Sequence, residues 1–477
     1  MFKLNPILYL SALLIFFSCK PESAKKEVNT LYPPVKRDLT EIKKDGKLRA
    51  LTTYSGTSYF LYRGKPMGFE YELLERFADY LGLELEIYVS DNIDSLIYAL
   101  NSGNIDLVAH GLTITSERKE TVNFTDYLYL THQVLVQKKP DKWRSMNWSA
   151  LQASLVKDAI ELIGDTVSVR HNSSYYERLQ NLSSEIGGKI VIDTLPGELS
   201  TDEIIKMVVD GEIKYTVADN NIASINASFY PVLDIEVPIS FSQRIAWAVR
   251  SSSPSLLNAA NEWIKAMKKE VDYYVIYNKY FKNERSFRKR IQSEFYSLNN
   301  NRISRYDDLI KKHASKIGWD WRFLASVIYQ ESRFNPEASS WAGARGLMQL
   351  MPSTAKSMGV NNRASPSQSI KGGTEYLEKI WGDFETVEDS IQRIKFTLAS
   401  YNCGYYHVQD ARELAKKRNL DANIWDDNVE EMILELSYPK TYNDPVVKYG
   451  YVRGIEPYTY VQQIFERYDH YRQFIES

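Results

Sequence analysis

The sequence predicts two folded domains, an α/β domain at residues 39–283 and a mainly α-helical domain at residues 304–477. The 477 residues are more than one ordinary hydrophobic core accommodates. Along the chain, short β-rich runs that alternate with amphipathic helices give way to helical periodicity alone. Hydrophobic residues at 44% and charged residues at 25% are typical of folded globular proteins, and a formal net charge of −2 argues against a nucleic-acid-binding protein.

The α/β prediction rests on strands and helices that alternate between residues 48 and 111. Apolar β-rich runs indicate the strands, and apolar residues at three- and four-residue spacing indicate the helices. A repeated strand, helix, strand order favours a parallel sheet. The expected strands are residues 48–53, 83–89 and 105–111, and the expected helices are residues 69–81 and 93–101.

The second domain is predicted to be helical, and its most informative helix carries Glu331. Phe323, Leu324, Val327 and Ile328 share one stripe with Glu331, so this carboxyl points where apolar residues point. The expected helices are residues 306–317, 319–334, 352–357, 370–381 and 391–401, with a last one from residue 458.

The helix with Glu331 should end near Phe334, because Pro336 disfavours helical geometry in the residue before it. Glu331 therefore belongs to the last turn, where free carbonyls carry partial negative charge. That charge and partial burial both raise the expected pKa of the carboxyl. A carboxylic acid that is protonated near neutral pH can protonate the leaving oxygen of a sugar.

A loop rich in small residues follows at 343–347, and Pro352 marks the start of a new helix. The glycines allow backbone to approach a ligand closely, and Gln349 offers a donor and an acceptor to sugar hydroxyls.

Four features occur in the order typical of one enzyme family: Glu331-Ser332, Ser340, the run GARGLMQLMPSTA at 343–355, and Ser400-Tyr401-Asn402-Cys403-Gly404. This part of the chain resembles the lytic transglycosylase domain of the soluble type, which is lysozyme-like. The resemblance implies a peptidoglycan glycan strand as substrate, Glu331 as the catalytic acid, and contacts to sugar from Ser340, Gln349, Tyr401 and Asn402. The run at 453–461 resembles the family's last motif and implies a hydrogen bond from Tyr460 to the catalytic carboxyl.

No second acid with a motif of its own lies near Glu331, because Glu337 and Asp320 have the pattern of surface acids. One acid is sufficient for a non-hydrolytic cleavage in which the C6 hydroxyl of N-acetylmuramic acid closes a 1,6-anhydro ring. Two alternatives stay open at this point: a lysozyme-like hydrolase, and a ligand receptor whose helical domain only holds murein.

The first domain resembles family 3 extracellular solute-binding proteins. The resemblance rests on residues 68–74, 106–108, 111–118 and 123–127. It implies a periplasmic-binding-protein-like fold of two lobes joined by crossing strands, with a ligand between them. The expected lobes are residues 39–137 with 227–283, and residues 138–226.

The same resemblance implies an amino-acid site in this domain. Arg118 would grip an α-carboxylate through its two-pronged guanidinium, and Thr113 would add a hydroxyl. Ser173 and Ser174 would present amides at a helix start, and Asp219 would face an ammonium group. A cell-wall-derived amino acid or muropeptide is the expected ligand, and a domain that keeps the fold only as a scaffold is the alternative.

The N-terminus predicts export and a membrane anchor. Residues 1–18 hold one early charge, Lys3, and an apolar run too short to span a membrane. Phe16-Phe17-Ser18-Cys19 resembles a bacterial lipoprotein processing site, which implies that Cys19 becomes a lipidated first residue. A plain signal peptide or an uncleaved anchor are the alternatives. Residues 19–38 are expected to be a flexible tether.

Only two cysteines occur, so a lipidated Cys19 leaves no internal disulfide, and Cys403 is expected to be a small buried residue. The six histidines are scattered, so neither a metal site nor a cofactor is predicted. The polar stretch 284–303 is expected to connect the domains, with its basic run on a solvated helix face. The whole order of segments resembles the F-type membrane-bound lytic transglycosylases, which implies a periplasmic enzyme at the outer membrane.

Overall fold

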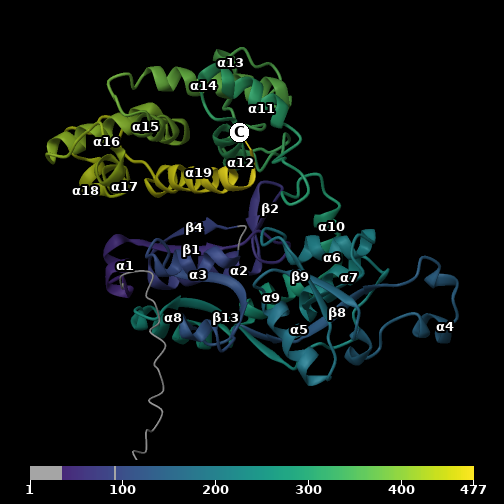
Figure 1. Cartoon of the computed structure of the whole chain (residues 1–477). Helices are drawn as coiled ribbons and strands as arrows, with labels where there is room; N and C mark the ends of the chain where they lie inside the picture. The colour runs from purple at the N-terminus through teal and green to yellow at the C-terminus, as the bar shows by residue number, and fades with distance from the viewer. Residues whose placement is uncertain (1–34, 91–92, 477) are drawn as a thin grey trace, which may run out of the picture.

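The computed structural model describes residues 35–90 and 93–476. The predicted signal peptide, Cys19 and most of the tether lie outside these residues. The helical domain stands on one side of the α/β domain, and the segment around β2 and α10 runs between them (Figure 1). Within the described ranges, no helix combines the length and the apolar character that crossing a membrane requires.

The first lobe is built on a mixed sheet in the order β4-β1-β5-β13-β6, and β7 pairs with β13. The β1 strand pairs in parallel with β4 and with β5, as the alternation predicts, whereas β13 runs antiparallel to β5. Its strands are β1 (Lys47–Thr52), β2 (Phe60–Tyr62), β3 (Lys65–Met67), β4 (Glu84–Val89), β5 (Leu107–Thr113), β6 (Val122–Phe124), β7 (Tyr129–Thr131) and β13 (Gln243–Arg250), and its helices are α1 (Leu39–Asp45), α2 (Phe69–Leu81), α3 (Ile93–Asn101), α8 (Pro254–Met267) and α9 (Val271–Phe281).

The second lobe contains an antiparallel sheet in the order β11-β8-β12 and a parallel pair of β9 and β10. Its helix α4 lies on an arm that projects away from the lobe (Figure 1). The strands are β8 (Gln133–Lys138), β9 (Thr166–Arg170), β10 (Val191–Leu195), β11 (Tyr215–Asp219) and β12 (Leu233–Asp234), and the helices are α4 (Trp148–Ala153), α5 (Ser174–Glu185), α6 (Thr201–Asp210) and α7 (Asn220–Phe229).

The expected lobe boundaries at residues 137 and 227 were wrong by several residues. The β8 strand pairs with β11 and β12, so the chain enters the second lobe at His132, between β7 and β8. It returns between Ile239, whose amide bonds Gln133, and the start of β13. Strands that cross between sheets continue the same apolar pattern, so the sequence carried no mark of either crossing.

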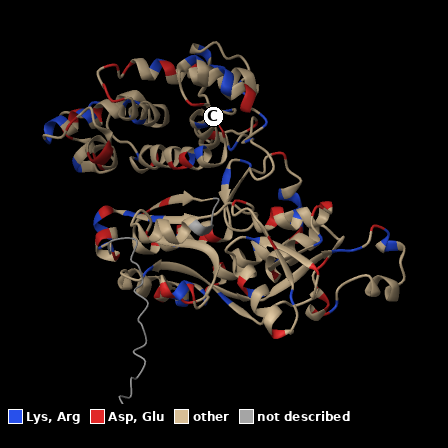
Figure 2. Ribbon diagram, viewed as in Figure 1, with Lys and Arg blue, Asp and Glu red and all other residues tan. Residues whose placement is uncertain are grey.

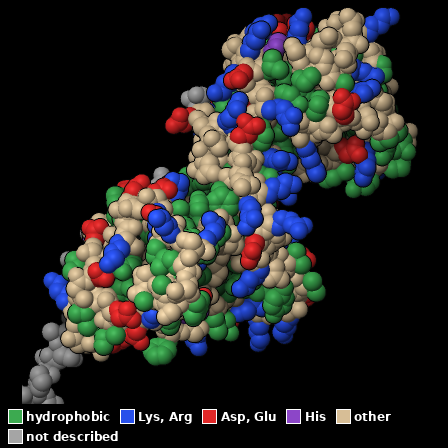
Figure 3. Space-filling view, turned by 90° about the vertical axis from the view of Figure 1, so that its right-hand side faces the viewer, with side chains coloured by type: hydrophobic (Ala, Val, Ile, Leu, Met, Phe, Trp, Pro, Cys, Tyr) green, Lys and Arg blue, Asp and Glu red, His purple; other side chains and the backbone are tan. Residues whose placement is uncertain are grey.

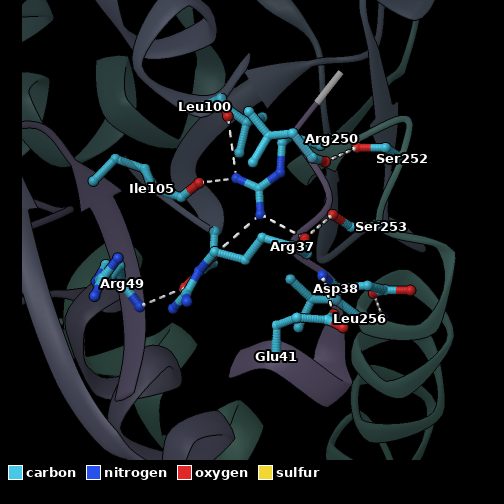
Figure 4. Close-up of polar contacts among 12 residues, drawn as sticks. Arg37, Asp38, Glu41, Arg49, Leu100, Ile105, Arg250, Ser252, Ser253 and Leu256 are labelled. Atoms are coloured by element: carbon cyan, nitrogen blue, oxygen red, sulfur yellow. Dashed lines mark hydrogen bonds and ion pairs between the residues drawn. The ribbon is translucent and has the colours of Figure 1, made fainter. Parts of the chain in front are cut away.

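The end of the expected tether is also wrong, because residues 35–38 are bound to the first lobe (Figure 4). The Arg37 guanidinium bonds Asp106 at 2.7 Å, and buried Arg250 donates to the Arg37 carbonyl at 2.9 Å. The Asp38 carboxylate accepts the backbone amide of Leu256 at 2.8 Å. A tether must therefore end before Val35.

The segment after the first domain is folded against both lobes. Helix α10 (Glu284–Ile291) places Arg290 in the interior, only 1% exposed, above the rings of Phe60 and Tyr280. Ser297 then donates its amide to Leu61 beside strand β2. The expected solvated basic face is thus correct for Arg288 and Lys289 and wrong for Arg290, which lies three residues after buried Phe287 on the same face.

The helical domain packs around α12, whose apolar face is buried against α19 and α11. Its helices are α11 (Asp307–Ala314), α12 (Trp321–Ser332), α13 (Pro352–Ser357), α14 (Pro366–Gly382), α15 (Ser390–Cys403), α16 (Tyr405–Lys417), α17 (Glu430–Glu435), α18 (Pro439–Tyr442) and α19 (Ile455–Phe474). Helices α16, α17 and α18 were absent from the sequence-based expectation.

Two segments join the domains. The tip of the β2–β3 hairpin meets the helical domain at Gly64, whose carbonyl accepts the Tyr471 hydroxyl at 2.8 Å. From the other side, Phe474 at the end of α19 packs on Tyr54 and Tyr59, with ring centres 4.6 and 4.7 Å apart. Basic and acidic side chains are interspersed over both domains (Figures 2 and 3), in keeping with the small net charge.

Candidate active site

Helix α12 carries Glu331 to the edge of the helical domain. The helix begins after Asp320, whose carboxylate accepts the Arg322 amide at 2.8 Å, and it ends at Ser332. Arg333 and Phe334 both adopt left-handed backbone, with φ of 52° and 60°. The helix therefore ends two residues before the expected position, and Glu331 occupies its last turn as predicted.

One hydroxyl holds the Glu331 carboxyl. Tyr460, in the second turn of α19, donates its phenol hydrogen to Oε1 of Glu331 over 2.5 Å. Burial raises the pKa of Glu331 to about 7, and the Tyr460 hydrogen bond opposes that rise. The carboxyl is thus balanced between its protonated and ionised forms near neutral pH.

The loop after α12 is tied to the helix next to the carboxyl. The Ser332 hydroxyl donates to the Leu347 carbonyl at 2.8 Å, and the Gly346 amide donates to Ala338 at 3.0 Å. Gly346 has a φ of 90°, and a β-carbon there would lie 1.9 Å from the Arg363 carbonyl oxygen. The glycine is required at this position because no side chain fits between the two backbones.

Gln349 and Ser340 lie in this loop but differ in what they can offer a sugar. The side-chain amide of Gln349 donates to the carbonyls of Ala338 and Gly346, both at 2.9 Å, so its hydrogens stabilise the loop. Only its carbonyl oxygen remains for a ligand. Ser340 is exposed, and its oxygen accepts the Ala344 amide at 3.0 Å.

Tyr401 and Asn402 come from the last turn of α15. The Tyr401 hydroxyl donates to the Met348 carbonyl at 2.7 Å, so its hydrogen is used within the protein and only its oxygen could still accept a bond from a sugar. Burial, and to a smaller extent the charge of Glu331, raise the pKa of Tyr401. Asn402 is exposed. Burial raises the pKa of Cys403 to about 12, which fits the expectation of an unreactive thiol.

Neither nearby acid joins Glu331. Asp320 caps the opposite end of α12 and pairs with Arg322 at 2.6 Å. Glu337 is exposed and pairs with Arg345 at 2.9 Å. Among the residues that the structure describes, no group of three His, Cys, Asp or Glu side chains is placed to hold a metal ion.

A second site lies between the lobes of the first domain, where a cavity of about 520 Å³ is lined by Arg118, Thr113, Ser174 and Asp219. The Ser174 hydroxyl donates to Thr113 Oγ1 across the lobes at 3.3 Å. Asp219 is 5% exposed, and burial raises the pKa of its carboxyl to about 7. Within the described part of the chain, Oδ1 of Asp219 has no hydrogen-bond partner.

Sequence reasoning missed three residues of this cavity. Arg170 ends β9 and donates to the Leu199 carbonyl at 3.1 Å. Burial and two arginines lower the pKa of His110 to about 3, so it is neutral and bonds Thr53 at 2.9 Å. Tyr54 lines the cavity and donates its hydroxyl to the Gln473 carbonyl of α19 at 2.5 Å. An arginine at the carboxyl end of a strand was the one available signal.

Known proteins match both domains of the chain. Residues 51–283 match bacterial extracellular solute-binding proteins, family 3, and residues 308–424 match the transglycosylase SLT domain. Membrane-bound lytic murein transglycosylase F from Desulfosudis oleivorans is 36% identical over 437 residues, which cover 92% of this chain and 92% of that protein. This chain belongs to the membrane-bound lytic murein transglycosylase F family.

A second relative agrees with this assignment. The transglycosylase F of Photobacterium profundum is 34% identical over 90% of this chain and 81% of its own length. An ancestral amino acid-binding protein of known structure aligns with 51% of this chain and 99% of its own, at 28% identity and a TM-score of 0.41. The predicted fold class, two-lobed α/β followed by a lysozyme-like helical domain, is confirmed, and so is the prediction of a lytic transglycosylase.

Proposed function

We propose that this lytic transglycosylase cleaves the β-1,4 bond between N-acetylmuramic acid and N-acetylglucosamine in peptidoglycan and leaves 1,6-anhydro ends. The observation that carries the proposal is a single carboxyl with a pKa of about 7, held by Tyr460 through one oxygen. The two acids closest to Glu331 in the sequence are engaged elsewhere, Asp320 with Arg322 at the far end of α12 and Glu337 with Arg345, so neither is offered as the nucleophile or base of an ordinary glycosidase.

Glu331 acts first as acid and then as base. Its proton passes to the glycosidic oxygen while the bond from that oxygen to C1 of the muramic acid breaks. The N-acetyl group of the same sugar stabilises the positive charge that develops at C1. The C6 hydroxyl oxygen then bonds to C1, and the Glu331 carboxylate takes the hydroxyl proton. The acid is regenerated and no water is consumed.

The first test compares the parent with Glu331→Gln on purified sacculi, with the released fragments weighed by mass spectrometry. Anhydro ends from the parent and none from the variant support the proposal, because the amide occupies the same space without a proton to give. Reducing ends would favour the hydrolase. Release from neither protein would favour the receptor.

We also propose a ligand for the first domain. The α-carboxylate of an amino acid would bind Arg118 and the amides at the start of α5, and its ammonium would bind Asp219. Beyond Asp219 the cavity continues along α7 past Ile222, Asn226 and Tyr230, which gives a muropeptide room to extend.

Occupancy of this cavity would regulate the enzyme if the ligand prefers one arrangement of the domains. Support comes from Tyr54, which lines the cavity and bonds α19, the helix that also carries Tyr460. Titration calorimetry with free amino acids and muropeptides, and rates on sacculi with each, test both parts. A ligand that binds without altering the rate would leave the domain as a receptor.

For location, we propose that Cys19 is lipidated and that the protein faces the periplasm from the outer membrane. The support is the sequence of the processing site, which lies outside the described residues. Fractionation of cells that express the parent or Cys19→Ser tests the anchor. The parent should sediment with outer membranes and the variant should be soluble.

A further inference from the structure

Trp341 lies at the tip of a turn in the loop that follows α12, and its side chain is 100% exposed. It directly follows Ser340, which is expected to contact the substrate. A single exposed aromatic residue is common on protein surfaces and by itself indicates nothing. Trp341 differs from an ordinary exposed aromatic residue in how its backbone is hydrogen-bonded.

The turn around Trp341 is fixed by hydrogen bonds on all sides. The Ser340 amide donates to the Ala344 carbonyl at 2.9 Å, and the Gly343 amide donates to the Ser340 carbonyl at 3.0 Å. From outside the turn, the Arg363 guanidinium donates to the Gly343 carbonyl at 2.6 Å. The backbone of Trp341 is therefore held in place, while its side chain stays open to a ligand.

The same network links the turn to the acid. Ser332, the neighbour of Glu331, bonds Leu347, and Gly346 bonds Ala338, two residues before Ser340. The loop that carries the turn is therefore bonded to the residue next to the acid. An exposed aromatic residue on a backbone that is already ordered loses less entropy on binding than one on a loop that must first be ordered.

We infer that Trp341 stacks against a sugar ring of the glycan strand, at a position beyond the bond cleaved at Glu331. This rests on the proposed function. A pyranose ring presents C–H groups on its faces, which suit the negative face of an indole. The turn from Ser340 to Ala344 carries no charge, and the next residue, Arg345, is already paired with Glu337. Such a surface fits a glycan better than an anionic lipid layer.

The test uses the full chain and soluble, uncrosslinked murein strands. Trp341→Ala should raise KM about tenfold and leave kcat within about twofold, because stacking aids binding without touching the reacting atoms. Trp341→Phe should stay within about threefold of the parent KM because a ring face remains. Trp148→Ala is the matched control, since Trp148 is 75% exposed on the projecting α4 and should change neither constant.

An unchanged KM in Trp341→Ala would overturn the inference, and so would equal effects of Ala and Phe. Analytical ultracentrifugation tests a competing occupant of this surface. A dimer for the parent and a monomer for Trp341→Ala would show that a second copy of the chain covers this ring, and would overturn the inference. If the parent releases no anhydro ends, the proposed function is wrong, but the inference about Trp341 is not yet tested by that result. Strand binding by Glu331→Gln and by its double variant with Trp341→Ala, measured by titration calorimetry, still decides the role of Trp341.

Discussion

The Glu331 carboxyl owes its pKa of about 7 to burial, and Tyr460 limits that shift by stabilising the ionised form. A catalytic acid must give its proton easily and also hold it near neutral pH, so the two opposing effects fit the task.

Activity on sacculi should fall on the alkaline side as pH rises through about 7, because Glu331 loses the proton it must donate. In Tyr460→Phe the ionised carboxylate loses its hydrogen bond, so its pKa rises and the alkaline limb moves upward by about one pH unit. Rates of the parent and the variant from pH 5 to 9 measure this. Tyr458→Phe on the same helix is the control, and a downward shift would contradict the argument.

Stability should respond to the same carboxyl. Its folded pKa of about 7 lies above the ordinary value of 4.5, so ionisation destabilises the folded state increasingly from pH 4.5 to 7 and fully above that. Glu331→Gln removes this penalty. The variant should melt at a higher temperature than the parent at pH 8 and at nearly the same temperature at pH 4, as measured by calorimetry. A gain that is equal at both pH values would exclude this cause.

Among the elements, the loop from Ala338 to Leu350 depends on backbone geometry more than on side chains. Gly346 takes a left-handed φ and lies against the Arg363 backbone. The chain contains a matched control in Gly359, which has a φ of 67° and open space around its α-carbon.

Gly359→Ala should cost about 1 kcal/mol of unfolding free energy, the strain of a left-handed alanine. Gly346→Ala adds a steric clash with backbone and should cost at least about 2 kcal/mol more, with loss of activity because Ser332 and Leu347 can no longer meet. Urea unfolding of both variants measures the difference. Equal costs would show that the loop can relax.

The helices that were predicted correctly are those whose ends are marked by local sequence signals. Helices α2, α3 and α13 have the predicted bounds, because Gly82 ends α2 in left-handed backbone and Pro352 starts α13. Helix α16 was missed, although the glycine at 404 precedes it. The buried Arg290 was missed as well, because its environment comes from Phe60 and Tyr280, which are distant in sequence.

The features of the candidate site also separate into those that local sequence predicts and those that depend on tertiary packing. The last-turn position of Glu331 followed from periodicity and Pro336, both of which are local. The hydrogen bond from Tyr460, 129 residues away, was expected only through a family motif. No local pattern revealed that the side chains of Tyr401 and Gln349 donate hydrogen bonds to backbone carbonyls of the loop, because tertiary packing sets those partners.

At the scale of the whole molecule, α19 connects the two sites. Tyr460 near its start holds Glu331, and Phe474 at its end packs on Tyr54, which lines the cavity of the first domain. A rigid helix with both contacts can transmit a displacement from one site to the other.

Phe474→Ala should weaken the docking of α19 on the first domain. Hydrogen exchange should then accelerate in the segment from Tyr54 to Tyr59 and in the last turn of α19, because both lose a shared packing contact. Mass spectrometry of exchanged peptides measures this. Tyr274→Ala is the control, since that side chain is exposed on α9. Unchanged exchange in residues 54–59 would show that this contact does not couple the two domains.

Cleavage by one carboxyl without water can be followed by digesting sacculi with the parent in water labelled with ¹⁸O. The released fragments should have 1,6-anhydro ends that contain no ¹⁸O, because the oxygen that bonds C1 is the sugar's own C6 hydroxyl. Reducing ends that carry ¹⁸O would show that water is the nucleophile and would contradict this mechanism.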